Sequence, residues 1–181
     1  LEETDRLTGL TDDLLTLARG ETGRARLVPA PTDLAGLVGE VVDELRVLAE
    51  EREQDLAWAG GPPITATVDA ATLRQAVTNV LHNAIRYTAR GGRVKVAITA
   101  EEGGPAVIDV DDEGPGIPAG ERRRVFERFV RLDPARSSAE GGAGLGLAIA
   151  RQAVEANGGA ISFLDKEGPG SRCRITLPRP S

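Results

Sequence analysis

Two asparagines and an arginine repeat at helical spacing near the middle of the chain. Asn79, Asn83 and Arg86 stand at i, i+4 and i+7 within residues 69–88, DAATLRQAVTNVLHNAIRYT. At about 100° per residue, these three side chains share one face of a helix. An asparagine carbonyl can ligate Mg²⁺ and an arginine pairs with phosphate, so this face suits a hard cation beside phosphate oxygens. The alternative is the solvated side of an ordinary amphipathic helix.

An acidic residue followed by two glycines forms a second group. Residues 112–117, DEGPGI, directly follow a strand expected at 106–111. Glycine lacks a Cβ, so Gly114 and Gly116 would let a flat ligand approach the main chain. A buried carboxylate at Asp112 would accept a hydrogen bond from an exocyclic amine such as adenine N6. Alone, this pattern is weak evidence, because turns are built from the same residue types.

A glycine-rich loop precedes a later helix. Residues 141–149 read GGAGLGLAI, and main-chain N–H groups at the start of a helix favour an anion such as phosphate. The loop is not a Walker loop, because no Gly-Lys-Ser/Thr follows. It also departs from the dinucleotide-binding pattern, because Leu147 stands where a third glycine is due. A loop whose small residues serve only packing is the alternative interpretation.

The composition limits the class of protein. Of the 181 residues, 40% are hydrophobic but only 3% are aromatic, so a core must be aliphatic. No apolar run is long enough to span a membrane, and no signal peptide opens the chain. The single cysteine excludes an internal disulfide. The chain also has only one histidine, which argues against a zinc site. A net charge of -6 argues against nucleic acid as a partner. Because the first residue is leucine, we expect a fragment of a longer chain.

The periodicity of the remaining segments predicts helices and strands that would position these groups. Strands in hairpins with long helices between them favour an α+β fold, a two-layer α/β sandwich with helices on one face of the sheet. The expected strands are 26–30, 55–59, 64–68, 93–100, 106–111, 160–164 and 171–177. The expected helices run from Thr32 or Asp33 to about Arg52, over 69–88, through 118–129 as a short segment, and over 145–157.

The first residues of the chain have a different pattern. Leu7, Leu10, Leu14 and Leu17 follow the spacing of a leucine seam, which predicts a helix packed on another helix in this chain or in a second copy. Residues 20–24 are rich in glycine and charge and are interpreted as a domain boundary.

The chain carries five short motifs, at residues 79–88, 112–116, 125–129, 142–147 and 168–171. Their residues and their order along the chain resemble those of the catalytic, ATP-binding domain of bacterial sensor histidine kinases. The wider superfamily, GHKL, includes gyrase, heat-shock chaperones and the MutL proteins. The resemblance implies the Bergerat fold, a mixed and mostly antiparallel sheet. The motifs are an N box over residues 79–88, a first glycine box at 112–116, an F box at 125–129, a second glycine box at 142–147 and a last glycine motif at 168–171.

The resemblance also implies ATP and Mg²⁺ as ligands. Asn83 would ligate the metal with Asn79 beside it, and Arg86 would contact phosphate. Asp112 would bind adenine N6. The other expected nucleotide contacts are Tyr87, Gly114, Gly116, Ile117, Gly142, Gly144, Leu145, Gly146, Leu147 and Ser171.

A lid at residues 132–142 is expected near the terminal phosphates. Arg131 and Arg136 would reach those phosphates, and Phe126 and Phe129 would tether the lid to the core. The catalytic set implied by the resemblance is therefore Asn79, Arg86, Arg131 and Arg136.

The resemblance divides the chain into two parts. Residues 1–23 resemble the second helix of the dimerisation and phosphotransfer hairpin, and residues 24–181 the catalytic domain. The first hairpin helix, which carries the phosphoacceptor histidine in the family, is absent. The only histidine, His82, lies inside the N box. We therefore expect a protein histidine kinase domain that binds Mg·ATP but does not phosphorylate itself when alone.

Several other expectations follow from the family. The partners would be the phosphoacceptor helix of the same kinase and a response-regulator receiver domain. The full-length protein would be a homodimer and this fragment a monomer, as the cytoplasmic domain of an inner-membrane sensor. The alternatives are a nucleotide-sensing pseudokinase, an anti-sigma serine kinase and an ATPase of the gyrase or MutL type. That ATPase would need a Glu where this chain has Asn79, because Glu can activate a water.

Overall fold

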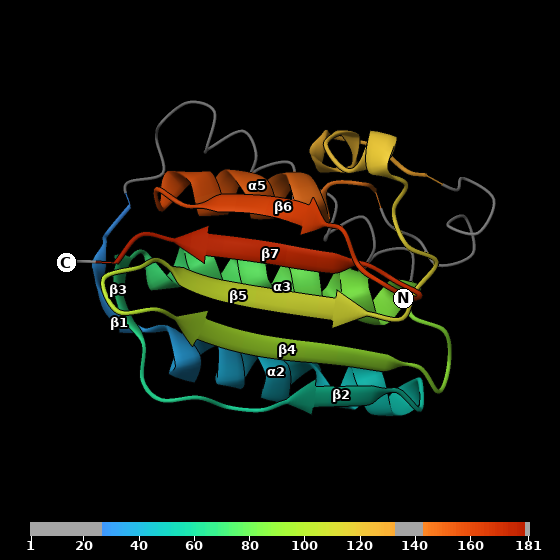
Figure 1. Cartoon of the computed structure of the whole chain (residues 1–181), viewed down its shortest axis with the longest axis horizontal. Helices are drawn as coiled ribbons and strands as arrows, with labels where there is room; N and C mark the ends of the chain where they lie inside the picture. The colour runs from blue at the N-terminus through green and yellow to red at the C-terminus, as the bar shows by residue number, and fades with distance from the viewer. Residues whose placement is uncertain (1–26, 133–142, 180–181) are drawn as a thin grey trace, which may run out of the picture.

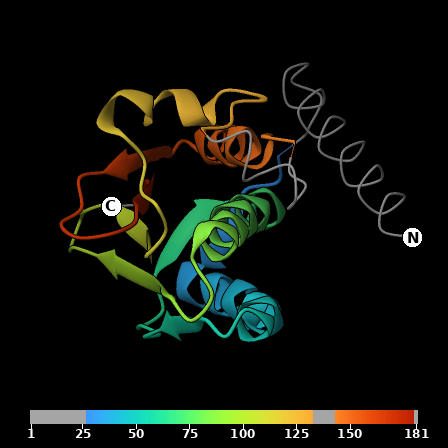
Figure 2. The same cartoon turned by 90° about the vertical axis from the view of Figure 1, so that its right-hand side faces the viewer.

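The computed structural model describes residues 27–132 and 143–179. In the described part of the chain, helices α2 (Leu34–Glu51), α3 (Ala70–Tyr87) and α5 (Gly146–Ala156) cover one face of a five-stranded sheet. Figure 1 shows this arrangement from the open side of the sheet and Figure 2 from the end. The two-layer α+β sandwich predicted from the sequence is therefore confirmed.

The sheet is mixed and mostly antiparallel. Its strand order is β2-β4-β5-β7-β6, and only the pair β2 and β4 is parallel. Along β5, every second residue is buried, ending with Asp112, so the last side chain of this strand points toward the helical layer. The strands are β2 (Asp55–Trp58), β4 (Arg93–Ala100), β5 (Ala106–Asp112), β6 (Ala160–Leu164) and β7 (Arg172–Leu177).

Helix α3 lies in the middle of the helical layer and packs against both α2 and α5. The Asp69 side chain caps it by accepting the Thr72 N–H at 2.8 Å. Its apolar stripe is buried, as the spacing predicts. The core is mostly aliphatic, with Cys173 buried among the same residues. The buried α3 residues are Leu73, Ala76, Val77, Val80, Leu81, Ala84 and Ile85.

The first strand differs from the prediction. It is β1 (Ala30–Asp33), which pairs antiparallel with β3 (Thr65–Val68) in a separate two-stranded sheet. The prediction of a strand over 26–30 was therefore wrong in its placement. The carboxylate of Asp33 accepts the N–H of Ala35, at 3.1 Å, and of Ile64, at 3.3 Å, so the end of β1 is fixed by the cap of α2.

The segment after β5 also differs from the prediction. The helix expected through 118–129 is two short 3₁₀ turns, η1 (Ala119–Glu121) and η2 (Arg124–Phe126). The second turn packs on the sheet, because the centre of the Phe126 ring lies 5.3 Å from that of Phe163 on β6. Phe129 then adopts φ +62°, which is incompatible with a continuing helix.

Some predictions lie outside the described residues. The leucine-seam helix and the proposed boundary near residue 23 are among them, as are Arg136, Gly142 and most of the expected lid. Within residues 27–132 and 143–179, no helix is both long and apolar enough to cross a membrane.

Candidate functional site

The polar face of α3 lies beside the start of α5. Asn79, Asn83 and Arg86 are all half-buried. A Cβ placed on Gly146, the first residue of α5, would lie 3.7 Å from Asn79 Oδ1. Among the described residues, Asn79 Nδ2 is buried without a hydrogen-bond partner. Because buried amides are normally satisfied, this face is suited to a polar ligand.

Tyr87 is the last residue of α3. Its side chain is exposed, and the Arg86 guanidinium carbon lies 5.6 Å from the centre of its ring. This distance is typical of a cation–π contact. The pair places an aromatic edge and a positive charge at the end of the helix.

Asp112 is buried and held by hydrogen bonds. It is 8% exposed, and its Oδ1 accepts the N–H of Gly114 at 2.8 Å and of Ser171 at 3.2 Å. Burial raises the pKa of the Asp112 carboxyl, while the two N–H donors oppose that rise. Main-chain groups from two separate loops thus hold this carboxylate in one orientation.

Close packing around Asp112 excludes side chains. A Cβ on Gly170, which has φ +90°, would lie 1.7 Å from the Asp112 carbonyl oxygen. A Cβ on Gly114 would lie 2.8 Å from Asp112 Oδ1 and 3.0 Å from the carbonyl oxygen of Tyr87. Gly116, at φ +79°, lies against the Gly170 carbonyl. The glycines of the first and last boxes therefore pack on each other and on the end of α3.

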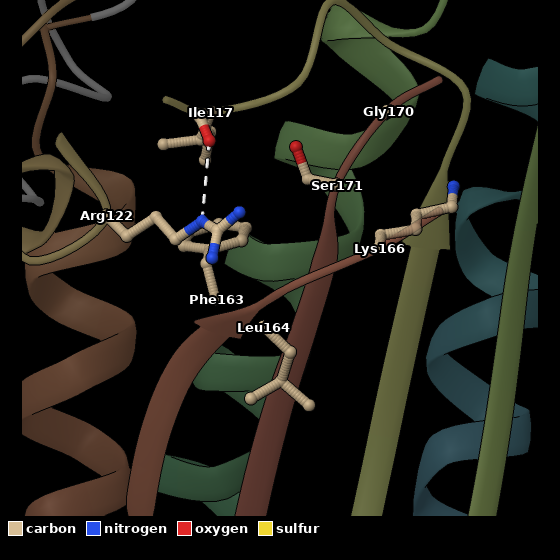
Figure 3. A pocket seen from close by; sticks show the side chains of 7 residues that line it. All are labelled: Ile117, Arg122, Phe163, Leu164, Lys166, Gly170 and Ser171. Atoms are coloured by element: carbon tan, nitrogen blue, oxygen red, sulfur yellow. Dashed lines mark hydrogen bonds between the residues drawn. The ribbon is translucent and has the colours of Figure 1, made fainter. Parts of the chain in front are cut away.

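Sequence reasoning missed Lys166. Its Nζ donates a hydrogen bond to the main-chain carbonyl of Asp112 from the loop after β6. Figure 3 shows Lys166 lining a pocket of about 30 Å³ with Ile117, Gly170 and Ser171, at whose edge Arg122 Nε donates to the Ile117 carbonyl at 3.4 Å. The pocket borders the first and last glycine motifs but has room for little more than a water. No local motif marks this lysine.

The start of α5 presents main-chain donors. Leu145 occupies the N-cap position and makes no side-chain capping bond, which leaves the first N–H groups of the helix for another acceptor. Gly144 has φ +71°, and a Cβ there would lie 2.9 Å from the Val130 carbonyl oxygen. The Phe129 N–H donates to the Gly144 carbonyl at 2.9 Å. Contacts with the F box thus fix this glycine turn.

The F-box phenylalanines have different environments. Phe126 is buried, as the tether prediction requires, whereas the Phe129 side chain is 61% exposed. The Phe129 ring is therefore not part of the core, and this residue is held through its main chain. Its role in tethering the lid, most of which lies outside the described residues, stays a prediction. Nearby, Arg131 Nε and Nη2 are buried without a hydrogen-bond partner among the described residues.

His82 and Cys173 are reactive residue types to which the sequence assigns no role at the site. His82 is exposed overall, but partial desolvation of its ring and the positive charges of Arg86 and Arg52 lower its pKa. The imidazole is therefore mainly neutral at pH 7. Burial raises the pKa of the Cys173 thiol, which keeps it protonated and makes it a core residue without chemistry.

The donor set suits Mg²⁺ bound with nucleotide better than an all-protein metal site. In the described part of the chain, no three His, Cys, Asp or Glu side chains gather closely enough to hold a metal ion. Mg²⁺ usually keeps waters and takes one or two protein oxygens with substrate phosphates. The half-buried carboxamide of Asn83 is such an oxygen donor.

Known proteins share both the sequence and the arrangement. The family of histidine kinase-, DNA gyrase B- and HSP90-like ATPases matches residues 68–181. The probable sensor histidine kinase TcrY of Mycobacterium tuberculosis is 40% identical over 169 residues, which cover 92% of this chain and 34% of TcrY. WalK of Bacillus subtilis, a sensor histidine kinase, is 33% identical over 177 residues, covering 97% of this chain and 29% of WalK.

Solved structures of sensor histidine kinases share the fold of this chain. Full-length ShkA, crystallised in complex with AMPPNP, superposes with a TM-score of 0.85 at 35% identity, covering 98% of this chain and 36% of ShkA. The structure of the mycobacterial sensor histidine kinase MprB gives a TM-score of 0.71 at 35% identity, covering 85% of this chain and all of that one. This chain spans about a third of the curated relatives' length. The chain belongs to the histidine kinase-, DNA gyrase B- and HSP90-like ATPase family, among its sensor histidine kinases.

Proposed function

We propose that this chain binds Mg·ATP and donates the γ-phosphoryl group to a histidine on a separate helix of a two-component signalling kinase. The observation that carries the proposal is the buried carboxylate of Asp112, fixed by main-chain donors beside the end of α3. This group would accept the exocyclic amine of adenine. Guanine has a carbonyl at that position, and a carbonyl facing a carboxylate leaves both without a partner.

The other predicted residues supply groups of the right chemistry for a triphosphate. Asn79 and Asn83 present carboxamides, Arg86 is a guanidinium on the same helical face, and the start of α5 presents N–H donors. Asn83 would hold Mg²⁺, which neutralises phosphate charge when bound. Arg131 would contact the terminal phosphates, since its buried N–H groups have no acceptor among the described residues. The chain's own contribution is then to bind and orient the nucleotide.

The phosphoacceptor is proposed to lie outside this fragment. In the transfer, a histidine nitrogen would form a bond to the γ-phosphorus as the bond to the β–γ bridging oxygen breaks and ADP leaves. His82 shares α3 with the proposed metal ligand Asn83, so it is poorly placed for an in-line attack from the opposite side. Residues 1–23 would be the second helix of the phosphotransfer hairpin.

The proposed partners follow from the kinase assignment. They are the missing acceptor helix and the receiver domain of a response regulator. The parent protein would be a homodimeric membrane sensor with this chain on its cytoplasmic side, whereas the fragment alone would be a monomer.

The test is transfer of labelled phosphate. The fragment is incubated with γ-labelled Mg·ATP alone, and again with a separate protein carrying the acceptor hairpin of a related sensor kinase. We expect no acid-labile label in the first sample and label on the hairpin protein in the second. Label on His82 of the fragment alone would refute a separate acceptor. Nucleotide binding without transfer to any hairpin would favour a nucleotide-sensing module instead.

A further inference from the structure

Gln54 is a buried polar residue in the turn between α2 and β2. It is 7% exposed, although glutamine is usually a surface residue. The residue before it, Glu53, has φ +54°, so the chain turns sharply at this point. A buried carboxamide needs hydrogen-bond partners, and those of Gln54 come from another part of the chain.

The partners of Gln54 are the main-chain carbonyls at the C-terminal end of α3. Its Nε2 lies 2.9 Å from the carbonyl oxygen of Ile85, 2.8 Å from that of Thr88 and 3.4 Å from that of Ala89. The last carbonyls of a helix have no intrahelical partner, and Ile85 is among them. Arg52 adds a second contact, from its Nη1 to the Arg86 carbonyl at 3.3 Å. The turn after α2 thus caps α3 from outside.

The capped turn of α3 contacts the loop that orients Asp112. The Tyr87 carbonyl oxygen would lie 3.0 Å from a Cβ on Gly114, so the two main chains are closely packed. The Gly114 N–H in turn donates to Asp112 Oδ1 at 2.8 Å. A shift of the last turn of α3 would therefore displace a donor to the Asp112 carboxylate.

The orientation of the Gln54 carboxamide supports this role. Its Oε1 is buried and has no hydrogen-bond partner in the described part of the chain. The opposite orientation would place Oε1 against three carbonyl oxygens, which repel it, so the donor must face α3. An apolar side chain of similar shape would avoid the unsatisfied Oε1. Donation to the carbonyls of α3 accounts for the amide at this position.

We propose that Gln54 is a positioning residue for the nucleotide site. It fixes the C-terminal turn of α3, and through the Tyr87–Gly114 contact it holds the donor that orients Asp112. Among the described residues, the Gln54 side chain hydrogen-bonds only to main-chain carbonyls of α3 and the residues after it, so we assign it no contact with the nucleotide. The inference rests on the proposed function for the identity of the bound molecule, but its structural step needs no ligand.

The experiment compares Gln54→Met, which removes the donor at similar size, with Val38→Ala, a control in the α2 core far from these hydrogen bonds. Val38 is 0% exposed, so the control also loses stability. Amide hydrogen exchange of Gly114 is measured without nucleotide, under conditions in which both variants are folded. We expect the exchange rate of the Gly114 amide to rise at least about tenfold in Gln54→Met. The rise in Val38→Ala should be much smaller when the two variants are compared at equal free energy of unfolding.

The second readout is the Kd for Mg·AMPPNP. We expect it to rise about tenfold in Gln54→Met and less than about twofold in Val38→Ala, which corresponds to a difference of about 1 kcal/mol. Should Gln54→Met fail to fold, Gln54→Asn keeps a shorter carboxamide and should show a smaller change in the same direction. Unchanged Gly114 exchange in the folded Gln54 variant, or equal changes in the control, would overturn the proposal. If the wild-type chain bound no nucleotide, the proposed function would fail, while Gly114 exchange would still decide the role of Gln54.

Discussion

The two ends of the proposed nucleotide site are built in different ways. At the base end, main-chain donors and glycines packed against carbonyl oxygens hold Asp112. At the phosphate end, side chains come from α3 and from the segment just after the F box, and polar atoms of Asn79 and Arg131 are buried without partners among the described residues. Within the described residues, protein groups alone hold the base end, whereas we expect a bound ligand to satisfy the unpaired polar atoms at the phosphate end. Changes at the base end should therefore affect folding or base recognition, and changes at the phosphate end should affect mainly affinity.

The largest expected effect is on folding, at Gly170. In Gly170→Ala the new Cβ would overlap the Asp112 carbonyl oxygen, 1.7 Å away, and alanine is strained at φ +90°. The two effects together should cost about 3 kcal/mol or more of the free energy of unfolding. Denaturant titration monitored by circular dichroism measures this loss.

Gly168→Ala is the matched control for that variant. Gly168 has φ +84° in the same loop, but its Cβ would meet nothing within 4 Å. It should lose only the conformational part, roughly 1–2 kcal/mol. Equal losses in the two variants would show that the packing of Gly170 on Asp112 does not matter.

Base recognition gives the next largest effect. Asp112→Asn should weaken ATP binding by about tenfold or more, because a hydrogen bond to a charged group is worth about 1.5–3 kcal/mol. The control is Asp111→Asn, since Asp111 pairs with Arg172 at 2.7 Å and is adjacent in sequence. Calorimetric titration with ATP compares them. If Asp111→Asn lost as much ATP affinity as Asp112→Asn, the result would contradict a specific role of Asp112 in binding the base.

The phosphate end is tested through its metal. Asn83→Ala should remove most of the Mg²⁺ dependence of ATP affinity, because its carbonyl is the proposed protein ligand. The neighbouring His82→Ala keeps that carbonyl and should retain the dependence. ATP is titrated into each variant with Mg²⁺ and with a chelator. A full magnesium effect in Asn83→Ala would place the metal elsewhere.

The smallest effect concerns stability and pH. Because burial raises the pKa of Asp112, its ionised form destabilises the fold above the pKa of the unfolded carboxyl, and protonation relieves this as pH falls. Unliganded Asp112→Asn should therefore match or exceed the melting temperature of the wild-type protein at pH 7. The difference should shrink at about pH 3, where the carboxyl is neutral in both states. A loss of stability at pH 7 would mean that the charge of Asp112 supports the fold.

The sequence predicted those parts of the molecule that depend on local patterns. The polar face of α3 followed from the spacing of Asn79, Asn83 and Arg86. Parts that depend on distant segments were missed or misplaced. Lys166 reaches the Asp112 carbonyl from 54 residues away, and β2 pairs in parallel with β4 rather than with the next strand in sequence, β3.

Phe129 illustrates why such features are hard to predict. A phenylalanine in a run with Phe126 favours burial by composition alone. Its positive φ and the hydrogen bond of its N–H to Gly144 instead turn the side chain outward. Both depend on a glycine turn that precedes α5, and no pattern within the F box indicates that contact.

The most direct test of the account is a pair of calorimetric titrations of the wild-type chain, one with Mg·ATP and one with Mg·GTP. A prebuilt base end centred on Asp112 predicts that ATP binds and that GTP binds at least about tenfold more weakly, because guanine cannot donate to the carboxylate from that position. Equal affinities for the two nucleotides would contradict the assignment of Asp112 as the base-recognition residue.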